Sequence, residues 1–181
     1  MTIFLSGGAK SGKSSLAQEL TLALAQGNTR YYVATMVPVD EEDHRRIRLH
    51  LADREGMGFE TIECGEDILS CLSRIRPGYA FLIDSATALL QNAMFPPEKG
   101  YAMDLQRARK CADDLTAFLK AVPNAVVVSD YIYSDALRYD ESTECYRRCL
   151  ADIDRTLARV CDTVIEVFAG QITIHKGELP T

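Results

Sequence analysis

Short, mainly apolar runs recur along the chain and alternate with longer stretches in which apolar residues return every three or four positions. A continuous apolar run of about four to eight residues is typical of a strand that is covered on both faces of a sheet. The runs predict strands at 2–5, 31–35, 60–62, 79–84, 125–129, 163–168 and 171–175. The last two are separated by Ala169 and Gly170 and predict an antiparallel hairpin.

The longer stretches predict helices, because apolar positions at this spacing fall on one side of a helix. The predicted helices cover residues 13–26, 41–55, 66–75, 85–95, 104–121 and 142–161. Two other segments are expected to lack regular structure. Residues 95–100 contain consecutive prolines, which cannot donate backbone hydrogen bonds, and residues 130–140 show no periodicity.

Strands that alternate with helices predict an α/β fold. In such a fold, helices cover both faces of a mainly parallel sheet, and here we expect an antiparallel strand at one edge. A chain of 181 residues is long enough for one substantial core but short for two. We therefore expect one domain that spans residues 1–181.

The segment after the first predicted strand fits the phosphate-binding pattern G-x-x-x-x-G-K-[ST]. Its glycines let the backbone turn with N–H groups pointing inward, and the next helix adds the positive end of its dipole. The segment therefore predicts a site for the phosphates of a nucleoside triphosphate, rather than a glycine-rich turn that arose by chance. Its residues are Gly7, Gly8, Ala9, Lys10, Ser11, Gly12, Lys13 and Ser14.

Three side chains near this loop carry specific chemistry. We expect Lys13 to reach the β- and γ-phosphates and act in catalysis, and the Ser14 hydroxyl to ligate Mg²⁺. Asp84 ends a predicted strand, and the carboxyl ends of parallel strands face the ligand crevice, so Asp84 is a second candidate ligand for Mg²⁺. The alternative is that Asp84 or Ser85 only caps the next helix.

A histidine lies between two arginines on the predicted helix 41–55. Arg46, His50 and Arg54 follow one another at intervals of four residues and therefore share one stripe of the helix. A histidine ring nitrogen can attack phosphorus while the arginines hold the phosphates of the electrophile. The alternative is a solvated helix face whose charges are balanced by neighbouring acidic residues.

Composition and charge narrow the classes of function. A net charge of -6 argues against a broad nucleic-acid-binding face, which needs an excess of Lys and Arg. No apolar run approaches about 18 residues, so we expect no membrane span, and with no targeting segment before the phosphate loop we expect a cytoplasmic protein. The six cysteines are scattered and do not complete a zinc pattern, so we expect most of them to be core or partly buried thiols.

Five segments together resemble, in order and spacing, the bifunctional adenosylcobinamide kinase / adenosylcobinamide-phosphate guanylyltransferase family. They are the phosphate loop and residues 32–35, 46–50, 59–63 and 82–85. The resemblance implies a RecA-like P-loop NTPase fold and a homotrimer. It implies that ATP or GTP phosphorylates the corrinoid substrate adenosylcobinamide, and that GMP then passes from GTP to that phosphate through a guanylylated histidine at His50.

The resemblance also implies further nucleotide contacts outside the phosphate loop. These fall on Ala34, Thr35, Met36, Leu51, Ala52, Asp53, Arg54, Glu63 and Asp84. No separate guanine-reading motif is present, so ATP and GTP are both candidate substrates.

The sequence departs from this family in its second half. The family usually carries Asn-Glu-Val-Gly where this chain has Asp130-Tyr131-Ile132-Tyr133, so a glutamate and a glycine are replaced by tyrosines. The family's Arg-Asp and Asn-Gln pairs fall on Arg147-Arg148 and Asp154-Arg155. The alternatives to the bifunctional enzyme are therefore a P-loop kinase for another alcohol without a histidine intermediate, and a non-catalytic nucleotide-binding module.

Overall fold

The strands of the described chain form a single sheet in the order β3-β2-β4-β5-β1-β6-β7. The computed structural model describes residues 1–74, 76 and 78–180. The strands are β1 (Thr2–Gly7), β2 (Arg30–Ala34), β3 (Phe59–Glu63), β4 (Ala80–Asp84), β5 (Ala125–Asp130), β6 (Thr163–Phe168) and β7 (Gln171–Lys176). Neighbours from β3 to β6 are parallel, and β6 pairs antiparallel with β7. The predicted parallel sheet with an antiparallel edge hairpin is confirmed.

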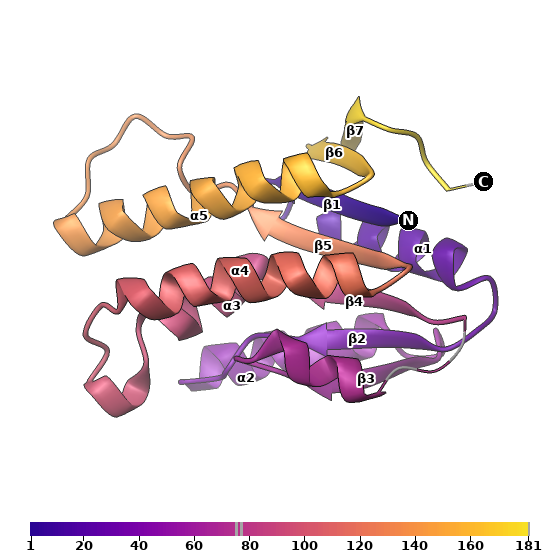
Figure 1. Cartoon of the computed structure of the whole chain (residues 1–181), viewed down its shortest axis with the longest axis horizontal. Helices are drawn as coiled ribbons and strands as arrows, with labels where there is room; N and C mark the ends of the chain where they lie inside the picture. Colours follow the sequence, from indigo (N-terminus) through magenta and orange to yellow (C-terminus); the bar gives the residue numbers. More distant parts are fainter. Residues whose placement is uncertain (75, 77, 181) are drawn as a thin grey trace.

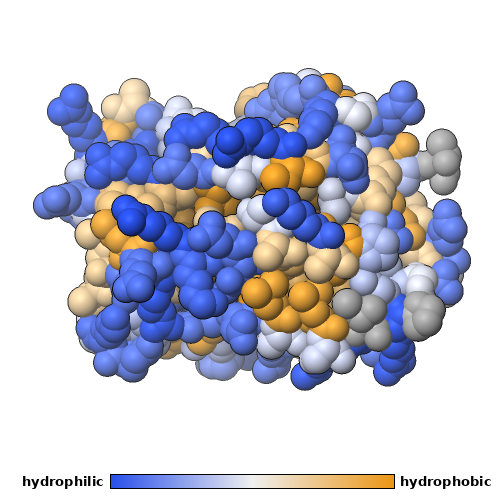
Figure 2. All heavy atoms as spheres, viewed as in Figure 1, coloured by the Kyte–Doolittle hydropathy of each residue, from blue (hydrophilic) through white to orange (hydrophobic). Residues whose placement is uncertain are grey.

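Helices cover both faces of this sheet (Figure 1). They are α1 (Lys13–Ala25), α2 (Glu41–Asp53), α3 (Ala86–Met94), α4 (Leu105–Ala121) and α5 (Glu141–Val160), with 3₁₀ helices η1 (Ile68–Arg74) and η2 (Pro97–Lys99). Helix α1 packs on one face, and α3, α4, α5 and η1 pack on the other. The helices turn polar side chains outward, so hydrophilic groups cover most of the face in Figure 2, with a hydrophobic group over η1.

The strands in the middle of the sheet are apolar on both sides because both faces are buried. Val126 and Val127 are adjacent in β5, yet they belong to the cores on opposite faces, since successive side chains of a strand alternate. This is why the sequence shows continuous apolar runs there rather than alternation. Within the described ranges, no helix combines the length and the apolar character needed to cross a bilayer.

Two predicted elements differ from the structure. The predicted helix 66–75 is the 3₁₀ helix Ile68–Arg74, and residue 75 lies outside the described residues. Ile68 and Cys71 are its buried positions, and a spacing of three suits the three-residue turn of a 3₁₀ helix. The predicted loop 95–100 contains the short helix η2, which begins at Pro97 because the first turn of a helix needs no backbone N–H donor.

Side chains of α5 hold the segment between β5 and α5, which Figure 1 shows as a long excursion beyond the end of the sheet. Arg147 is buried and donates to the carbonyl of Leu137 at 3.1 Å and to the carboxylate of Asp135 at 2.8 Å. The Tyr133 hydroxyl donates to Asp154 Oδ2 at 2.8 Å. The φ of Tyr133 is not positive, so the chain does not strain a tyrosine into a glycine conformation here.

The carboxyl group of Asp154 is buried, and burial disfavours its charged form. It is 4% exposed, and its Oδ1 has no hydrogen-bond partner among the described residues. Burial raises the pKa of its carboxyl from 3.8 to about 6, although the hydrogen bond from Tyr133 opposes this rise. The folded chain therefore binds this proton more tightly than the unfolded chain does.

The buried acid makes the stability depend on pH. Because its folded pKa is raised, the contribution of Asp154 to the free energy of unfolding falls as pH rises from about 4 through about 6. Asp154→Asn does not titrate, so its free energy of unfolding relative to wild type should increase by about 1–3 kcal/mol between roughly pH 4 and pH 7. Urea denaturation at both pH values measures this, with the exposed Asp152→Asn as control. A difference that stays constant with pH would contradict the raised pKa.

Candidate nucleotide site

The phosphate loop lies between the carboxyl end of β1 and the start of α1. Gly12, with a φ of 97°, precedes the first turn of α1. A Cβ at Gly7 would collide with the backbone oxygen of Val167, so only glycine fits there. The turn of the C-terminal hairpin supports the loop from one side, because the Gly170 N–H donates to the Ser11 carbonyl at 3.1 Å.

Lys13 is folded over its own loop. Its side chain is 4% exposed, and its ammonium donates to the carbonyl oxygens of Gly7 at 3.1 Å and Gly8 at 2.6 Å. The ammonium also pairs with Asp130 Oδ1 at 2.7 Å. The positive charge therefore lies at the loop with a carboxylate as its counter-charge, and it must leave these partners to reach a phosphate.

Asp84 lies at the same edge of the sheet, two strands away from the loop. In the parallel register it is beside Ala34 of β2, which is beside Glu63 of β3, so the ends of three adjacent strands form a row. The Tyr32 hydroxyl donates to Asp84 Oδ2 at 2.9 Å. Burial raises the pKa of Asp84, whereas this hydrogen bond and the nearby His50 and Arg54 side chains oppose the rise.

The helix cap beside Asp84 comes from the next residue. The Ser85 hydroxyl accepts from the Ala88 N–H at 3.3 Å, so Ser85 caps α3 and the carboxylate of Asp84 is left for other partners. Thr35 also has a structural role here. It is fully buried, its hydroxyl donates to the Ser85 carbonyl at 2.8 Å, and it accepts from the Ser85 N–H at 2.6 Å. Its side chain thus joins the end of β2 to the β4–α3 turn.

Ser14 and Asp84 fit a magnesium–phosphate complex chemically. Both offer hard oxygen atoms, and Tyr32 donates to just one of the two Asp84 oxygens. The described residues contain no cluster of three or more His, Cys, Asp or Glu side chains that could enclose a metal. Mg²⁺ needs no such cluster, because it usually takes one or two protein ligands and completes its shell with phosphates and water.

Helix α2 contacts the sheet through its C-terminal end. None of its residues is buried, and Asp40 caps its start by accepting from the Asp43 N–H at 2.9 Å. Arg54, which ends the helix, is 7% exposed and places its guanidinium 3.4 Å from the centroid of the Tyr32 ring. One guanidinium nitrogen of Arg54, Nη1, is buried without a hydrogen-bond partner among the described residues.

The predicted stripe of α2 is therefore divided by the fold. His50 is half-buried one turn before Arg54, and it lies near enough to Asp84 to lower the pKa of that carboxyl. Arg46 is one turn further out, 57% exposed, and pairs with Asp43 at 3.8 Å. Leu51, Ala52, Asp53 and Glu63 are exposed, whereas Ala34 and Met36 are partly buried beside the row of strand ends.

Sequence reasoning missed two residues of this site. Asp130 contacts Lys13, and the available signal was an acid that ends an apolar strand, as Asp84 does. Tyr32 lies between Asp84 and Arg54; it begins the segment 32–35 that resembles the family, but the resemblance gave Tyr32 itself no role.

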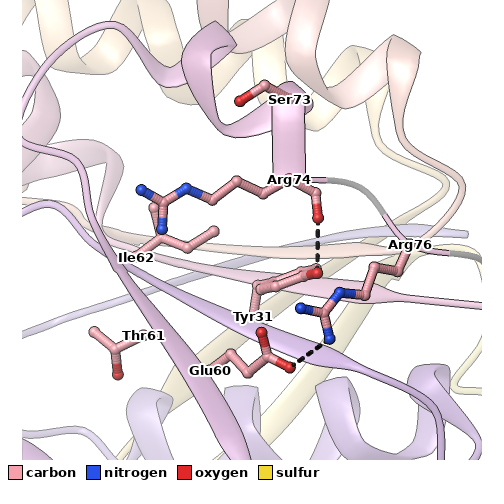
Figure 3. Close-up of a pocket in the computed structure, with 7 residues that line it drawn as sticks. All are labelled: Tyr31, Glu60, Thr61, Ile62, Ser73, Arg74 and Arg76. Carbon is pink, nitrogen blue, oxygen red and sulfur yellow. Dashed lines mark hydrogen bonds and ion pairs between the residues drawn. The ribbon is translucent and has the colours of Figure 1, made fainter.

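A cavity of about 370 Å³ lies elsewhere, beside the edge strand β3 (Figure 3). Tyr31 and Glu60 line this cavity, and they pair in register near the amino ends of β2 and β3. The row of Glu63, Ala34 and Asp84 lies at the opposite, carboxyl ends of the strands. The Tyr31 hydroxyl donates to the Arg74 carbonyl at 2.7 Å, and Arg76 pairs with Glu60 at 3.2 Å. The cavity is thus separate from the phosphate loop and from Asp84.

Two solved structures share the fold of this chain. A KaiC-like protein from Pyrococcus horikoshii matches with a TM-score of 0.54 and 14% identity, over 98% of this chain and 79% of that one. The flagellar accessory protein FlaH from Methanocaldococcus jannaschii matches with a TM-score of 0.50 and 17% identity, over 98% and 78%. Together with the phosphate loop between β1 and α1, these similarities confirm the predicted RecA-like P-loop fold.

Sequence comparison identifies the family. The chain is 25% identical over 182 residues to the bifunctional adenosylcobalamin biosynthesis protein CobU of Salmonella typhimurium, an alignment that covers 94% of this chain and 97% of that protein. The family model for cobinamide kinase / cobinamide phosphate guanyltransferase matches residues 3–174, from the first strand into the C-terminal hairpin. The chain therefore belongs to the cobinamide kinase / cobinamide phosphate guanyltransferase family.

Proposed function

We propose that this protein phosphorylates adenosylcobinamide with a nucleoside triphosphate and then transfers GMP from GTP to the new phosphate through a guanylylated His50. Family membership supports the two reaction types. The observation that supports the assignment of residues is the arrangement at the carboxyl edge of the sheet. There Lys13 lies at the phosphate loop, and Arg54 stacks on the Tyr32 ring, whose hydroxyl donates to Asp84.

In the proposed kinase step, the phosphate loop binds the triphosphate through its inward N–H groups. Lys13 exchanges the carbonyls of Gly7 and Gly8 for the β- and γ-phosphates, and so neutralises charge that develops during transfer. Ser14 and Asp84 would hold Mg²⁺, which when bound offsets the negative charge of the phosphates. The substrate hydroxyl then attacks the γ-phosphorus, and the nucleoside diphosphate leaves.

In the proposed transferase step, a ring nitrogen of His50 forms a bond to the α-phosphorus of GTP. The bond from that phosphorus to the bridging oxygen breaks, and pyrophosphate leaves. A phosphate oxygen of the corrinoid then attacks the same phosphorus and releases His50 unchanged. In this proposal Arg54, one turn after His50, holds the phosphates, and the exposed Arg46 can turn toward them.

The second candidate function is a kinase without a histidine intermediate. The observation that favours it is the segment Asp130–Tyr133, which departs from the family in a region next to the phosphate loop. Both candidates accept ATP or GTP in the kinase step, and for both we propose a cytoplasmic location. We also propose the homotrimer that the resemblance implies, which light scattering with size-exclusion chromatography can test.

The first prediction of the proposed function concerns Lys13. Lys13→Ala should lower phosphoryl transfer by at least about a hundredfold, because Lys13 neutralises the charge that develops on the phosphates in the transition state. Turnover of GTP and ATP with adenosylcobinamide measures the loss, with the exposed Lys120→Ala on α4 as the matched control. Wild-type turnover in Lys13→Ala would place the catalytic nucleotide elsewhere.

The second prediction concerns Asp84. Asp84→Asn keeps the size of the side chain and an oxygen that can accept from Tyr32, but it loses the negative charge. The Mg²⁺ concentration for half-maximal activity should rise by roughly tenfold or more. The cap of α3 stays intact because Ser85 supplies it, so thermal unfolding should change little. An unaltered magnesium titration, compared with the exposed Asp113→Asn, would assign Asp84 a structural role.

The third prediction concerns His50. His50→Asn should abolish covalent labelling of the protein by α-labelled GTP, because the nucleophile is gone. Phosphorylation of adenosylcobinamide should persist, since that step needs the loop and no protein nucleophile. His44→Asn is the matched control, because His44 is the other histidine of α2 and is exposed. If intact mass of the wild-type protein with GTP and Mg²⁺ shows no added GMP, the second candidate function is the better account.

A further inference from the structure

Asp130 lies between the two halves of the nucleotide site. It ends β5, the strand that separates β1 from β4. In the parallel register Asp130 is beside Gly7, the first residue of the phosphate loop, and two residues earlier Val128 is beside Asp84. The negative charge of Asp130 is close enough to Asp84 to add to the rise in the pKa of that carboxyl.

Neighbouring elements fix the position of this residue. The N–H of Asp130 donates to the Thr87 hydroxyl at 2.8 Å, and the Thr87 carbonyl in turn accepts from the Tyr146 hydroxyl of α5 at 2.9 Å. The next N–H, of Tyr131, donates to the Gly7 carbonyl at 3.3 Å. The backbone is thus held by α3 and β1, while the carboxylate remains 34% exposed and accessible to a substrate.

The carboxylate also contacts the cation that must move when a nucleotide binds. Asp130 Oδ1 lies 2.7 Å from Lys13 Nζ. Once Lys13 turns to the phosphates, the carboxylate loses its counter-charge but stays at the end of β5, beside Gly7 of the phosphate loop. An unpaired carboxylate at this place is suited to accept a proton.

The proposed kinase step leaves one proton without an acceptor. Lys13 binds phosphates, Asp84 accepts from Tyr32 and is assigned to the metal, and His50 is assigned to the second reaction. The hydroxyl of the acceptor must lose its proton as its oxygen attacks phosphorus.

We infer that Asp130 is the general base of phosphoryl transfer. This inference rests on the proposed kinase activity. In the step, the hydroxyl oxygen of the acceptor forms a bond to the γ-phosphorus, and the bond from that phosphorus to the β–γ bridging oxygen breaks. The hydroxyl proton passes to the Asp130 carboxylate and from there to water, and the nucleoside diphosphate leaves with the bond electrons.

The test separates a base from a simple partner of Lys13. Asp130→Asn keeps the shape of the side chain and an oxygen for the Lys13 ammonium, but it cannot take the proton. We expect kcat for phosphorylation of adenosylcobinamide to fall by about 10²–10⁴-fold. The Kd of a non-hydrolysable GTP analogue, measured by calorimetry, should stay within about threefold of wild type or become tighter, because the lysine is less strongly held.

Labelling of the protein by α-labelled GTP supplies a second readout. Guanylylation of His50 requires no acceptor hydroxyl, so Asp130→Asn should label like wild type. Asp113→Asn, an exposed carboxylate variant on α4, should match wild type in kinase activity. Asp130→Glu should recover part of the lost kcat, which shows that the carboxylate is the group required.

Three results would overturn the inference. A kcat of Asp130→Asn within about threefold of wild type would show that Asp130 is not the base and serves only as the ion-pair partner of Lys13. Loss of analogue binding in parallel with loss of activity would assign Asp130 to positioning the phosphate loop. Absence of phosphoryl transfer by the wild-type protein would overturn the proposed kinase function and this inference with it, whereas the first two results leave that function standing.

Discussion

Parallel backbone pairing across β2, β4, β5 and β1 sets the positions of the candidate site. Because these strands run in one direction, their last residues meet at one edge, and the register aligns Ala34 with Asp84 and Gly7 with Asp130. The phosphate loop leaves from β1 at this edge, and the N-terminus of α1 begins there. A slip of one residue in any of these pairings would turn the terminal side chain to the other face of the sheet.

A second constraint positions helix α2, which the core does not bury. Helix α2 has no buried residue, so packing alone does not fix its orientation. Its C-terminal end is held by the Arg54 guanidinium on the Tyr32 ring, and Tyr32 in turn donates to Asp84. Cation, ring and carboxylate therefore form one chain of contacts from the helix to the strand ends. The location of His50 relative to the phosphate loop depends on this chain.

Much of the fold was predictable from the sequence because its signals are local. The central strands are continuous apolar runs, and the phosphate loop is a fixed pattern of glycines, lysine and serine, so both could be located without tertiary information. The type of helix at η1 could not be predicted from the sequence, because the choice between an α-helix and a 3₁₀ helix depends on how Ile68 and Cys71 pack against the core. The sequence also predicted that Lys13 and Asp84 lie at the carboxyl edge of the sheet. Their functional roles stay predictions.

Other parts of the site depend on contacts between distant segments. The ion pair of Lys13 and Asp130 joins residues more than a hundred positions apart, and helical spacing placed Arg46, His50 and Arg54 together although the fold keeps Arg46 in solvent. The sheet order has a related consequence for synthesis of the chain. β1 is made first, but its neighbours are β5 and β6, so it has no strand partner until residues 125–130 have been made. The phosphate loop gains the support of Gly170 later still, so a growing chain carries its nucleotide motif well before it can complete the binding site, which requires residue 170 to have been made.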